Sequence, residues 1–295
     1  MKLLQLKVVL AAIDRDEMSS AVLRSARELA MAAGARLHVI NVVGVNAPQR
    51  DVPRESGPDA QLERLLHGAA IPPGEAAIHV VRGEAAREIR SFATTVSADV
   101  IVLGRHHRGA ESLGSTAMRV VTNAEAPCLI ISAPMTLPLE RVLVPVDLSE
   151  TARGALMLAL SWASALRGAE KSAGLVASES ANLTALLVNR HDPSGEADTA
   201  PEPLDDELRR LREEAGSWAS VTIDGVTVGG RDVAAAIAKF AGEHQSDLVV
   251  LGTRGLGADA VRRIGSVSEQ VMRQLGVPIL LVPPAVWSNN QNQNP

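Results

Sequence analysis

Short apolar runs alternate along this chain with longer segments whose apolar residues recur at helical spacing. In the first half, strands are predicted near 7–13, 35–43, 77–82, 99–104 and 128–132, and helices near 18–33, 59–67, 84–96 and 115–124. In the second half, strands are predicted near 141–146, 183–190, 220–228, 247–252 and 278–282, and helices near 150–167, 204–215, 231–243 and 266–275. Alternating strands and helices are typical of βαβ units, and continuous Val, Ile and Leu runs are typical of parallel strands buried on both faces. The pattern therefore predicts an α/β fold with a five-stranded parallel sheet in each half.

The two halves repeat one another. The phrase Asp-Val-Ile-Val-Leu-Gly ending at Gly104 returns as Asp-Leu-Val-Val-Leu-Gly ending at Gly252, 148 residues later, and the only two phenylalanines, Phe92 and Phe240, keep the same spacing. Self-similarity at one period indicates two copies of one domain. We predict a first domain over 1–137, a second over 138–286 and a disordered polar tail over 287–295.

Three segments interrupt the alternation. The stretch from Gly168 to Asn182 is rich in Ala, Ser, Glu and Gly, and we predict a surface excursion between the first helix and second strand of copy two. The stretches 44–58 and 191–203 contain Pro, Gly and Asp and are predicted as loops.

Composition narrows the classes of function. Hydrophobic residues make up 46% of the chain but aromatic residues only 2%, and the net charge is −5 without a basic block, so neither stacking platforms nor a cationic surface for nucleic acid is expected. No run is long enough to span a bilayer, and the first apolar run ends at Asp14 without a signal-peptide cleavage pattern. The single cysteine, Cys128, lies in an apolar strand and is expected to be inert and in a reducing compartment. These features predict a cytoplasmic protein without a membrane partner.

A glycine-rich loop follows the fourth strand of copy two. Gly252, Gly255 and Gly265 precede a helix that starts with Ser266 and includes Ser268. Glycines at a strand end allow positive φ and close approach of a ligand, while free N–H groups and the positive end of the next helix can seat a phosphate, with the two serine hydroxyls as further donors. The alternative is that the glycines only shape a turn and Ser266 caps the helix.

The Gly-x2-Gly-x9-Gly-Ser spacing, between the DLVVLG strand and a helix followed by Val-Pro-Ile-Leu-Leu-Val, resembles the ATP-binding signature of the universal stress protein family. The resemblance spans about 9–133 and 141–283. It implies a sheet of order 3-2-1-4-5 in each copy, ATP as the ligand, alone or with Mg²⁺, and adenine near Asp147, for which a helix N-cap is the rival role. It also implies an internal pseudo-dimer in which 128–132 lies antiparallel beside 278–282, while a homodimer of the whole chain stays open.

Copy one departs from this signature. Asp14, Gly104, Gly114 and Ser115 match the expected positions, but the loop is three residues shorter and His107 stands where the second glycine should be. A side chain at that point restricts positive φ, so we expect weaker or absent ATP binding in this copy. His106 and His107 lack further ligands at metal spacing and are interpreted as solvated loop residues. The same interpretation is favoured for Arg254, Arg262 and Arg263, although these could meet phosphates.

The sequence thus predicts a stress-response nucleotide-binding protein that binds ATP, mainly in copy two, and acts as a regulatory or protein-interaction module with an unknown protein partner. A Walker Gly-Lys-Ser/Thr sequence is absent, which disfavours fast phosphoryl transfer. Two alternatives remain: a slow ATPase or adenylyl-transfer enzyme on the same fold, and a ligand-free interaction protein.

Overall fold

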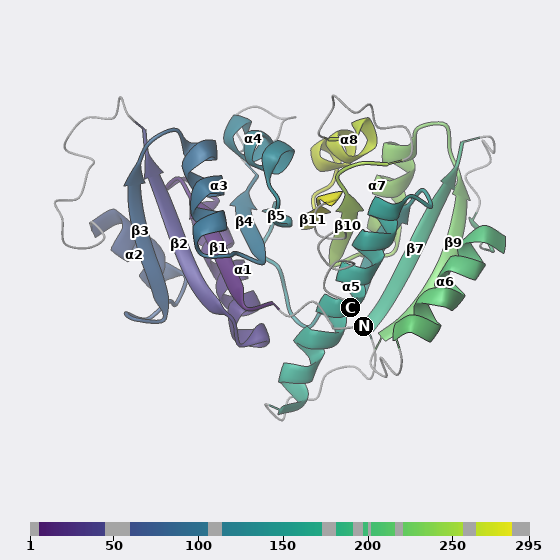
Figure 1. The fold of residues 1–295 in the computed structure, drawn as a ribbon, viewed down its shortest axis with the longest axis horizontal. Helices are drawn as coiled ribbons and strands as arrows, with labels where there is room; N and C mark the ends of the chain where they lie inside the picture. The colour runs from purple at the N-terminus through teal and green to yellow at the C-terminus, as the bar shows by residue number, and fades with distance from the viewer. Residues whose placement is uncertain are drawn as a thin grey trace. The chain divides into compact units, whose positions relative to one another are not determined.

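The computed structural model describes residues 6–44, 60–105, 114–172, 181–190, 197–199, 202–215, 221–255 and 264–284. These residues form two compact units, Leu6–Leu137 and the chain from Pro138 onward, each an open α/β sheet (Figure 1). The predicted tail over 287–295, most of the predicted loop 44–58, and His106 and His107 lie outside the described residues. The pairing of the two copies into a pseudo-dimer stays a prediction.

The first unit has the predicted order of strands and helices. Its elements are β1 (Val8–Ile13), α1 (Ser19–Ala33), β2 (Arg36–Val43), α2 (Ala60–Gly68), β3 (Ala76–Arg82), α3 (Ala85–Thr95), β4 (Val100–Gly104), α4 (Ser115–Asn123) and β5 (Cys128–Ile131). The strands are parallel in the order β3-β2-β1-β4-β5, which is the order that the resemblance implied. The inner strands β1 and β4 are buried, as their continuous apolar runs predict.

The second unit repeats this arrangement. Its elements are β6 (Arg141–Val146), α5 (Glu150–Ser172), β7 (Ala181–Asn189), β8 (Ala197–Thr199), α6 (Glu202–Ala215), β9 (Val221–Gly229), α7 (Val233–Glu243), β10 (Leu248–Gly252), α8 (Ser266–Gln274) and β11 (Ile279–Val282). The strand order is β11-β10-β6-β7-β9-β8, and the five predicted strands are parallel.

Two segments of the second unit differ from the prediction. The stretch 191–203 is not all loop, because β8 pairs antiparallel with β9 as a sixth strand and α6 begins at Glu202. A three-residue edge strand is too short to show alternation in the sequence. The predicted excursion from Gly168 is also wrong at its start, since α5 continues to Ser172. Ala, Glu and Lys in that stretch favour a helix enough to outweigh one glycine.

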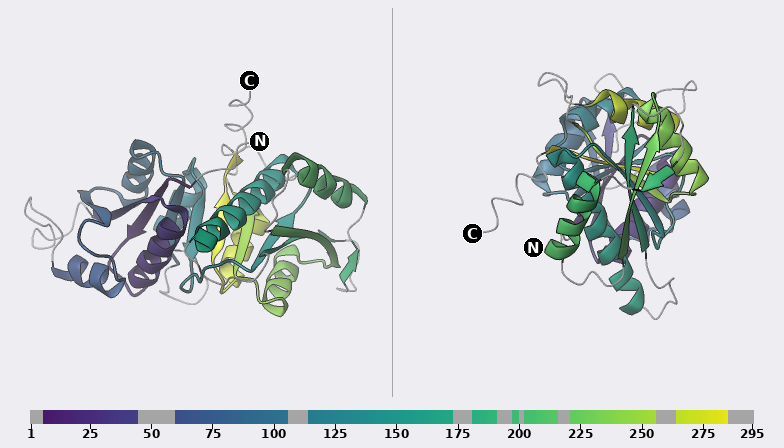
Figure 2. Two further views of the ribbon diagram at one scale, coloured as in Figure 1. Left: turned by 90° about the horizontal axis from the view of Figure 1, so that it is seen from below. Right: turned by 90° about the vertical axis from the view of Figure 1, so that its right-hand side faces the viewer.

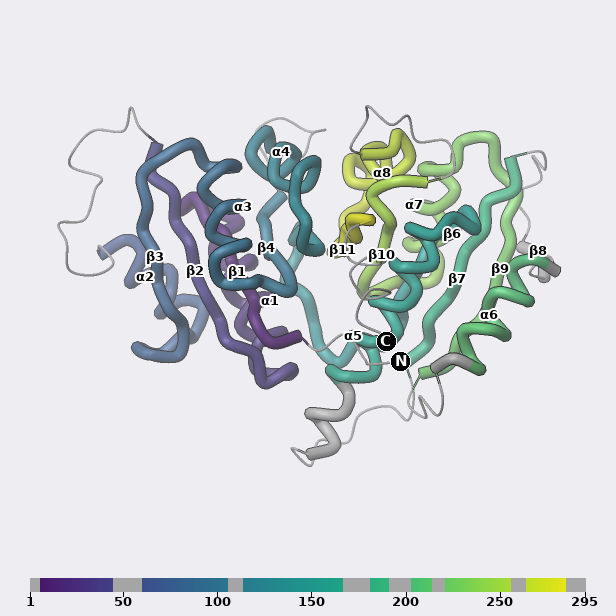
Figure 3. Tube along the Cα trace, viewed as in Figure 1, coloured from purple at the N-terminus to yellow at the C-terminus, as the bar shows by residue number. Residues whose placement is uncertain are grey.

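Helices cover both faces of each sheet (Figure 2). In the first unit α1 contacts α2 on one face, and α3 contacts α4 on the other. In the second unit α7 contacts α8, while an ion pair between Arg153 and Glu207 joins α5 to α6 on the opposite face. In each unit the chain therefore adds strands outward on both sides of its first strand. The strand order reverses between β1 and β4 in the first unit and between β6 and β10 in the second (Figure 3).

A repeated aspartate ties the fourth strand to the first in each unit. The Asp99 Oδ2 accepts hydrogen bonds from the backbone N–H of Lys7 and of Val8, both at 2.8 Å. In the second unit the Asp247 Oδ2 accepts from the N–H of Glu140 at 2.9 Å and of Arg141 at 2.8 Å. The aspartate that opens each repeated phrase therefore fixes the amino end of the first strand, and its recurrence reflects the fold.

Candidate functional site

The candidate site of the second unit lies where its strand order reverses. β6 and β10 are neighbours, Asp147 follows β6, and α8 begins above the same edge of the sheet (Figure 3). Ligands of open α/β sheets bind in this position, beyond the carboxyl ends of the strands. A cavity of ≈ 590 Å³ lies there. Its lining includes all six residues that the sequence singled out in this copy: Asp147, Gly252, Gly255, Gly265, Ser266 and Ser268.

Asp147 and Gly255 are in close contact. A β-carbon at position 255 would overlap the Asp147 Oδ2 and would lie 3.3 Å from its Cγ. The expectation that Gly255 supplies a positive φ is wrong, because among the described glycines only Gly34 and Gly74 have one. Glycine is required at position 255 because the loop passes directly over the carboxylate and leaves no room for a side chain.

Gly252 is also constrained by space. A β-carbon there would lie 2.8 Å from the Cγ2 of Thr151 and 3.2 Å from its carbonyl oxygen, both in the first turn of α5. Its φ also lies outside the left-handed region, so the positive φ expected here is wrong and glycine is again needed for space. The absence of a side chain lets the end of β10 approach the start of α5.

The amino end of α8 faces the cavity without a side-chain cap. Gly265 is the N-cap residue, with φ −75° and ψ 149°, and the first intrahelical bond runs from the Glu269 N–H to its carbonyl oxygen at 3.0 Å. The N–H groups of residues 266–268 precede that bond, so they and the helix dipole favour an anion. Ser266 is exposed at this end, and its role as a phosphate donor stays a prediction.

Ser268 does not have the donor role predicted from the sequence. Its side chain is 6% exposed, and its hydroxyl donates to the Gly252 carbonyl oxygen at 2.8 Å. Since a hydroxyl has one proton to donate, that proton is committed to the backbone. Ser268 therefore fastens α8 to the end of β10 and lines the cavity as a structural residue.

The N-cap role weighed for Asp147 belongs to Ser149. The Ser149 Oγ accepts from the Ala152 N–H at 3.2 Å, and its carbonyl oxygen accepts from the Arg153 N–H at 3.0 Å, so Ser149 caps α5. The Asp147 Oδ1 accepts from the Ser149 N–H at 3.1 Å. This bond orients the carboxylate within the turn after β6, and Asp147 lines the cavity.

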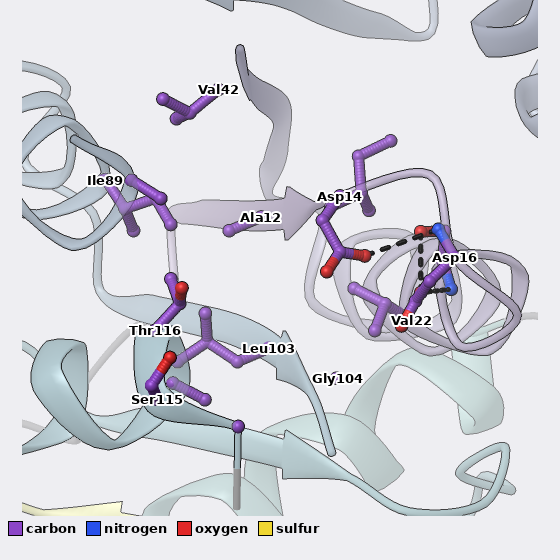
Figure 4. A pocket seen from close by; sticks show the side chains of 15 residues that line it. Ala12, Asp14, Asp16, Val22, Val42, Ile89, Leu103, Gly104, Ser115 and Thr116 are labelled. Atoms are coloured by element: carbon purple, nitrogen blue, oxygen red, sulfur yellow. Dashed lines mark hydrogen bonds between the residues drawn. The ribbon is translucent and has the colours of Figure 1, made fainter. Parts of the chain in front are cut away.

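The first unit has a smaller cavity at the equivalent place. It measures ≈ 240 Å³ and is lined by all four residues that matched the signature in this copy: Asp14, Gly104, Gly114 and Ser115. Figure 4 shows Asp14 and Asp16 on one side, Ser115 and Thr116 on the other, and Gly104 near the end of β4. Gly114 is the N-cap of α4 and, like its counterpart, brings no side-chain cap.

The turn that holds the aspartate is the same in both units. The Asp14 Oδ1 accepts from the Asp16 N–H at 3.3 Å, as Asp147 does from the residue two positions later. The residues between, Arg15 and Leu148, have φ 66° and 63°. Left-handed backbone at non-glycine residues is unusual and is often found at functional sites. Nothing in the residue pattern predicted this turn.

Two arginines also line the cavity of the second unit. Arg190 follows β7, next to β6 in the sheet, and Arg254 stands between Gly252 and Gly255. Arg254 was expected to be solvated, and no site role was expected for Arg190, although a position close after a strand could have indicated the site. An apolar wall lies on the same cavity, formed by Val146, Leu187, Val188, Val233 and Ile237.

The described residues contain no group of three or more His, Cys, Asp or Glu side chains arranged to hold a metal ion. None of their helices is both long and apolar enough to cross a membrane.

Comparison with known proteins identifies one family and several solved structures of similar fold. The family model described as the universal stress protein family matches residues 5–132 and 138–283. No curated protein matches the chain.

Solved structures resemble the chain over nearly all of its length. A Pseudomonas aeruginosa UCBPP-PA14 protein described as a universal stress protein is 16% identical, with a TM-score of 0.65 and 98% of each chain covered. A universal stress protein of Archaeoglobus fulgidus DSM 4304 is 20% identical, with a TM-score of 0.65, covering 95% of this chain and 99% of its own. An Archaeoglobus fulgidus universal stress protein in complex with dAMP is 23% identical, with a TM-score of 0.31, covering 42% of this chain and 96% of its own. The two similarities that cover nearly the whole chain, at 16% and 20% identity, show a shared fold.

Proposed function

Because the chain belongs to the universal stress protein family, we propose that its second unit binds an adenine nucleotide, with ATP as the preferred ligand. The bound nucleotide would set the conformation or the partner choice of a stress-response module. The proposal includes a cytoplasmic location, which the single cysteine supports.

One observation carries this proposal: the lining of a single cavity includes both a carboxylate and the start of a helix without a side-chain cap. Asp147 is an acceptor for amino or hydroxyl hydrogens of an adenosine group. The amino end of α8, at Gly265 and Ser266, favours a phosphate through its free N–H groups and its dipole. A nucleotide has both kinds of group in one molecule.

The shape and lining of the cavity support the same ligand. Small-molecule sites commonly measure roughly 300–1,000 Å³ and are mostly apolar with few polar groups. The second unit's cavity, at ≈ 590 Å³, lies in that range, and its aliphatic wall suits the faces of a purine.

The first unit supports the proposed difference between the two copies. Its cavity, at ≈ 240 Å³, lies below that range and has two carboxylates in its described lining, from Asp14 and Asp16. Negative charge there opposes phosphate binding. We therefore propose weaker nucleotide binding, or none, in this unit.

Mass spectrometry of the purified chain tests the proposal. Protein denatured after gel filtration should release an adenine nucleotide, and protein stripped of ligand should rebind added ATP. The Gly255→Val variant should carry no nucleotide, because its side chain needs the space of the Asp147 carboxylate. A wild-type chain that neither releases an adenine nucleotide nor binds added ATP would refute the proposal.

A further inference from the structure

The left-handed position of the aspartate turn holds a different residue in each unit. It is Arg15 after β1 and Leu148 after β6. In the first unit the Arg15 Nε donates to the Asn41 Oδ1 of β2 at 2.9 Å, and the Arg15 carbonyl oxygen accepts from the Gln61 Nε2 of α2 at 3.5 Å. That turn is therefore tied to the strand and the helix beside it. Leu148 has no polar side chain for such bonds and is 44% exposed.

An apolar cavity lies beside Leu148, between the start of α5 and the start of α6, and measures ≈ 260 Å³. We call it the Leu148 cavity. Its apolar lining residues are Val146, Leu148, Ala152, Leu156, Pro203 and Leu204. Among the described lining residues, only Val146 and Ala152 are shared with the candidate nucleotide cavity. The Leu148 cavity is therefore a separate space on the side of the sheet that α5 and α6 cover.

The charged residues of the described lining are two glutamates and one arginine. The Arg153 Nε lies 3.2 Å from the Glu207 Oε1, and both atoms are sealed from solvent, so this pair balances its own charge. Glu150, the first residue of α5, is exposed and also lines the cavity. Two carboxylates against one guanidinium give the described lining a net charge of −1. A ligand with one positive charge complements that lining.

The volume of the Leu148 cavity indicates the size of the ligand. An engineered apolar cavity of about 150 Å³ stays dry and binds benzene. The Leu148 cavity, at ≈ 260 Å³, has room for a bicyclic aromatic ring. Such a ring would also remove the exposed surface of Leu148 from water, which is favourable. A leucine that is both exposed and left-handed in its backbone is unfavourable on two counts, and strain of this kind is often found at binding sites.

We propose that the Leu148 cavity binds a small aromatic amine. The ring lies against Leu148, Leu156 and Leu204, and the ammonium group lies toward Glu150. Arg15 stands in place of Leu148 in the first unit, so the inference is confined to the second. It does not depend on the proposed nucleotide site, because the ligand and most of the lining are different.

Ligand-observed NMR titration of the full-length chain tests the inference with tryptamine, tryptophol and indole-3-propionate. These probes share one bicyclic ring and a two-carbon linker, and their head groups are cationic, neutral and anionic. Tryptamine should bind most tightly. Tryptophol should bind about 2-fold to 5-fold more weakly, as expected for the loss of one exposed charge interaction, and indole-3-propionate more weakly still.

Leu148→Arg introduces the residue of the first unit at the same backbone position. Arg15 has φ 66° there, so the turn accepts an arginine. The variant should weaken binding of tryptamine and of the neutral tryptophol by at least about 10-fold, because the apolar wall beside the ring is lost. Leu148→Met keeps that wall and should stay within about 3-fold of the wild type.

Two further variants separate the ring from the head group. Glu150→Gln should lower tryptamine affinity about 2-fold to 5-fold and leave tryptophol affinity unchanged. Met31→Arg is the matched control for Leu148→Arg, since Met31 is 60% exposed, lies in α1 and is outside the cavity lining. It should leave the affinities for all three probes unchanged.

The possible results are distinct. Unchanged affinities in Leu148→Arg would place the ring elsewhere, and indole-3-propionate binding as tightly as tryptamine would contradict the charge preference; either result overturns the inference. A wild-type chain that binds none of the three probes at millimolar concentration overturns it as well. ATP binding is measured separately, so the inference and the proposed function can each fail without the other.

Discussion

The carboxylate of Asp147 lies against the α-carbon of Gly255, in the space that any side chain at position 255 would need. Asp147 comes from the end of β6, and Gly255 from the loop after β10. Contact between them closes the loop over the carboxylate. This contact explains why the second glycine of the signature has no room for a side chain, and substitution at position 255 tests the explanation.

Replacing Gly255 with alanine should displace Asp147, destabilise the second unit by about 1–3 kcal/mol as overpacking does, and abolish nucleotide binding. The readout is the rise in melting temperature with ATP. At about one hundred times the dissociation constant, ATP should stabilise a binding-competent chain by about 2.7 kcal/mol, and the variant should lack that gain.

Gly276→Ala is the control for this substitution. A β-carbon at position 276 would meet no atom within 4 Å, and Gly276 is exposed, has no positive φ and lies outside the cavity lining. The expected change in stability is within about 0.5 kcal/mol, with ATP-dependent stabilisation retained. If the two alanine variants behave alike, the contact with Asp147 does not govern the site.

The aspartates that open the two repeated phrases should matter for stability and not for the ligand. Asp247→Ala leaves the N–H groups of Glu140 and Arg141 without their acceptor, and Asp99→Ala does the same in the first unit. We expect a loss of about 0.5–1.5 kcal/mol in urea unfolding for either variant, because most of these N–H groups lie near solvent. Asp224→Ala, at an exposed position of β9, should stay within about 0.5 kcal/mol of the wild type. A comparable loss at all three positions would contradict the account.

Predictability from the sequence differed between fold and site. The parallel strands were predictable because buried parallel strands are continuous apolar runs. The strand β8 was not predicted, because three residues are too few to show an alternating pattern. The spacing of glycines and serines predicted which residues line the cavity, but it did not predict the physical role of each one. Positive φ was expected at Gly255 where close approach is found, and a phosphate donor at Ser268 where the hydroxyl bonds Gly252. Such contacts depend on side chains far apart in the sequence.

Acid should destabilise the first unit through a histidine pair. The His38 Nδ1 lies 3.3 Å from the His79 Nε2, and the two rings stack. Burial lowers the pKa of both, and the charges of His79 and Arg36 lower the pKa of His38 further. The folded state therefore binds protons more weakly than the unfolded chain. The stabilisation is complete above about pH 6.5 and is lost as the pH falls through the lowered pKa values.

Melting temperatures measured between about pH 7.5 and pH 5 check this prediction. The His38→Gln/His79→Gln double variant should lose less stability over that interval than the wild type. Equal losses in both proteins would show that other groups cause the acid sensitivity.

The thiol of Cys128 should be unreactive in the folded chain. It is buried in β5, and burial raises its pKa to about 12, so the thiolate is rare near neutral pH. Labelling with a thiol-specific disulfide reagent at about pH 8 should be slow in buffer and fast in guanidinium chloride, where the pKa returns to about 8.5. Equally fast labelling in buffer would mean that β5 opens readily.

The most direct test of the central claim is calorimetric titration of the ligand-stripped full-length chain with ATP, in parallel with Gly255→Val. The account predicts one tight site per wild-type chain, since the larger cavity and its uncapped α8 lie in the second unit. It predicts no tight site in the variant, whose side chain overlaps the Asp147 carboxylate. Two equally tight sites in the wild type, or normal binding by Gly255→Val, would contradict it.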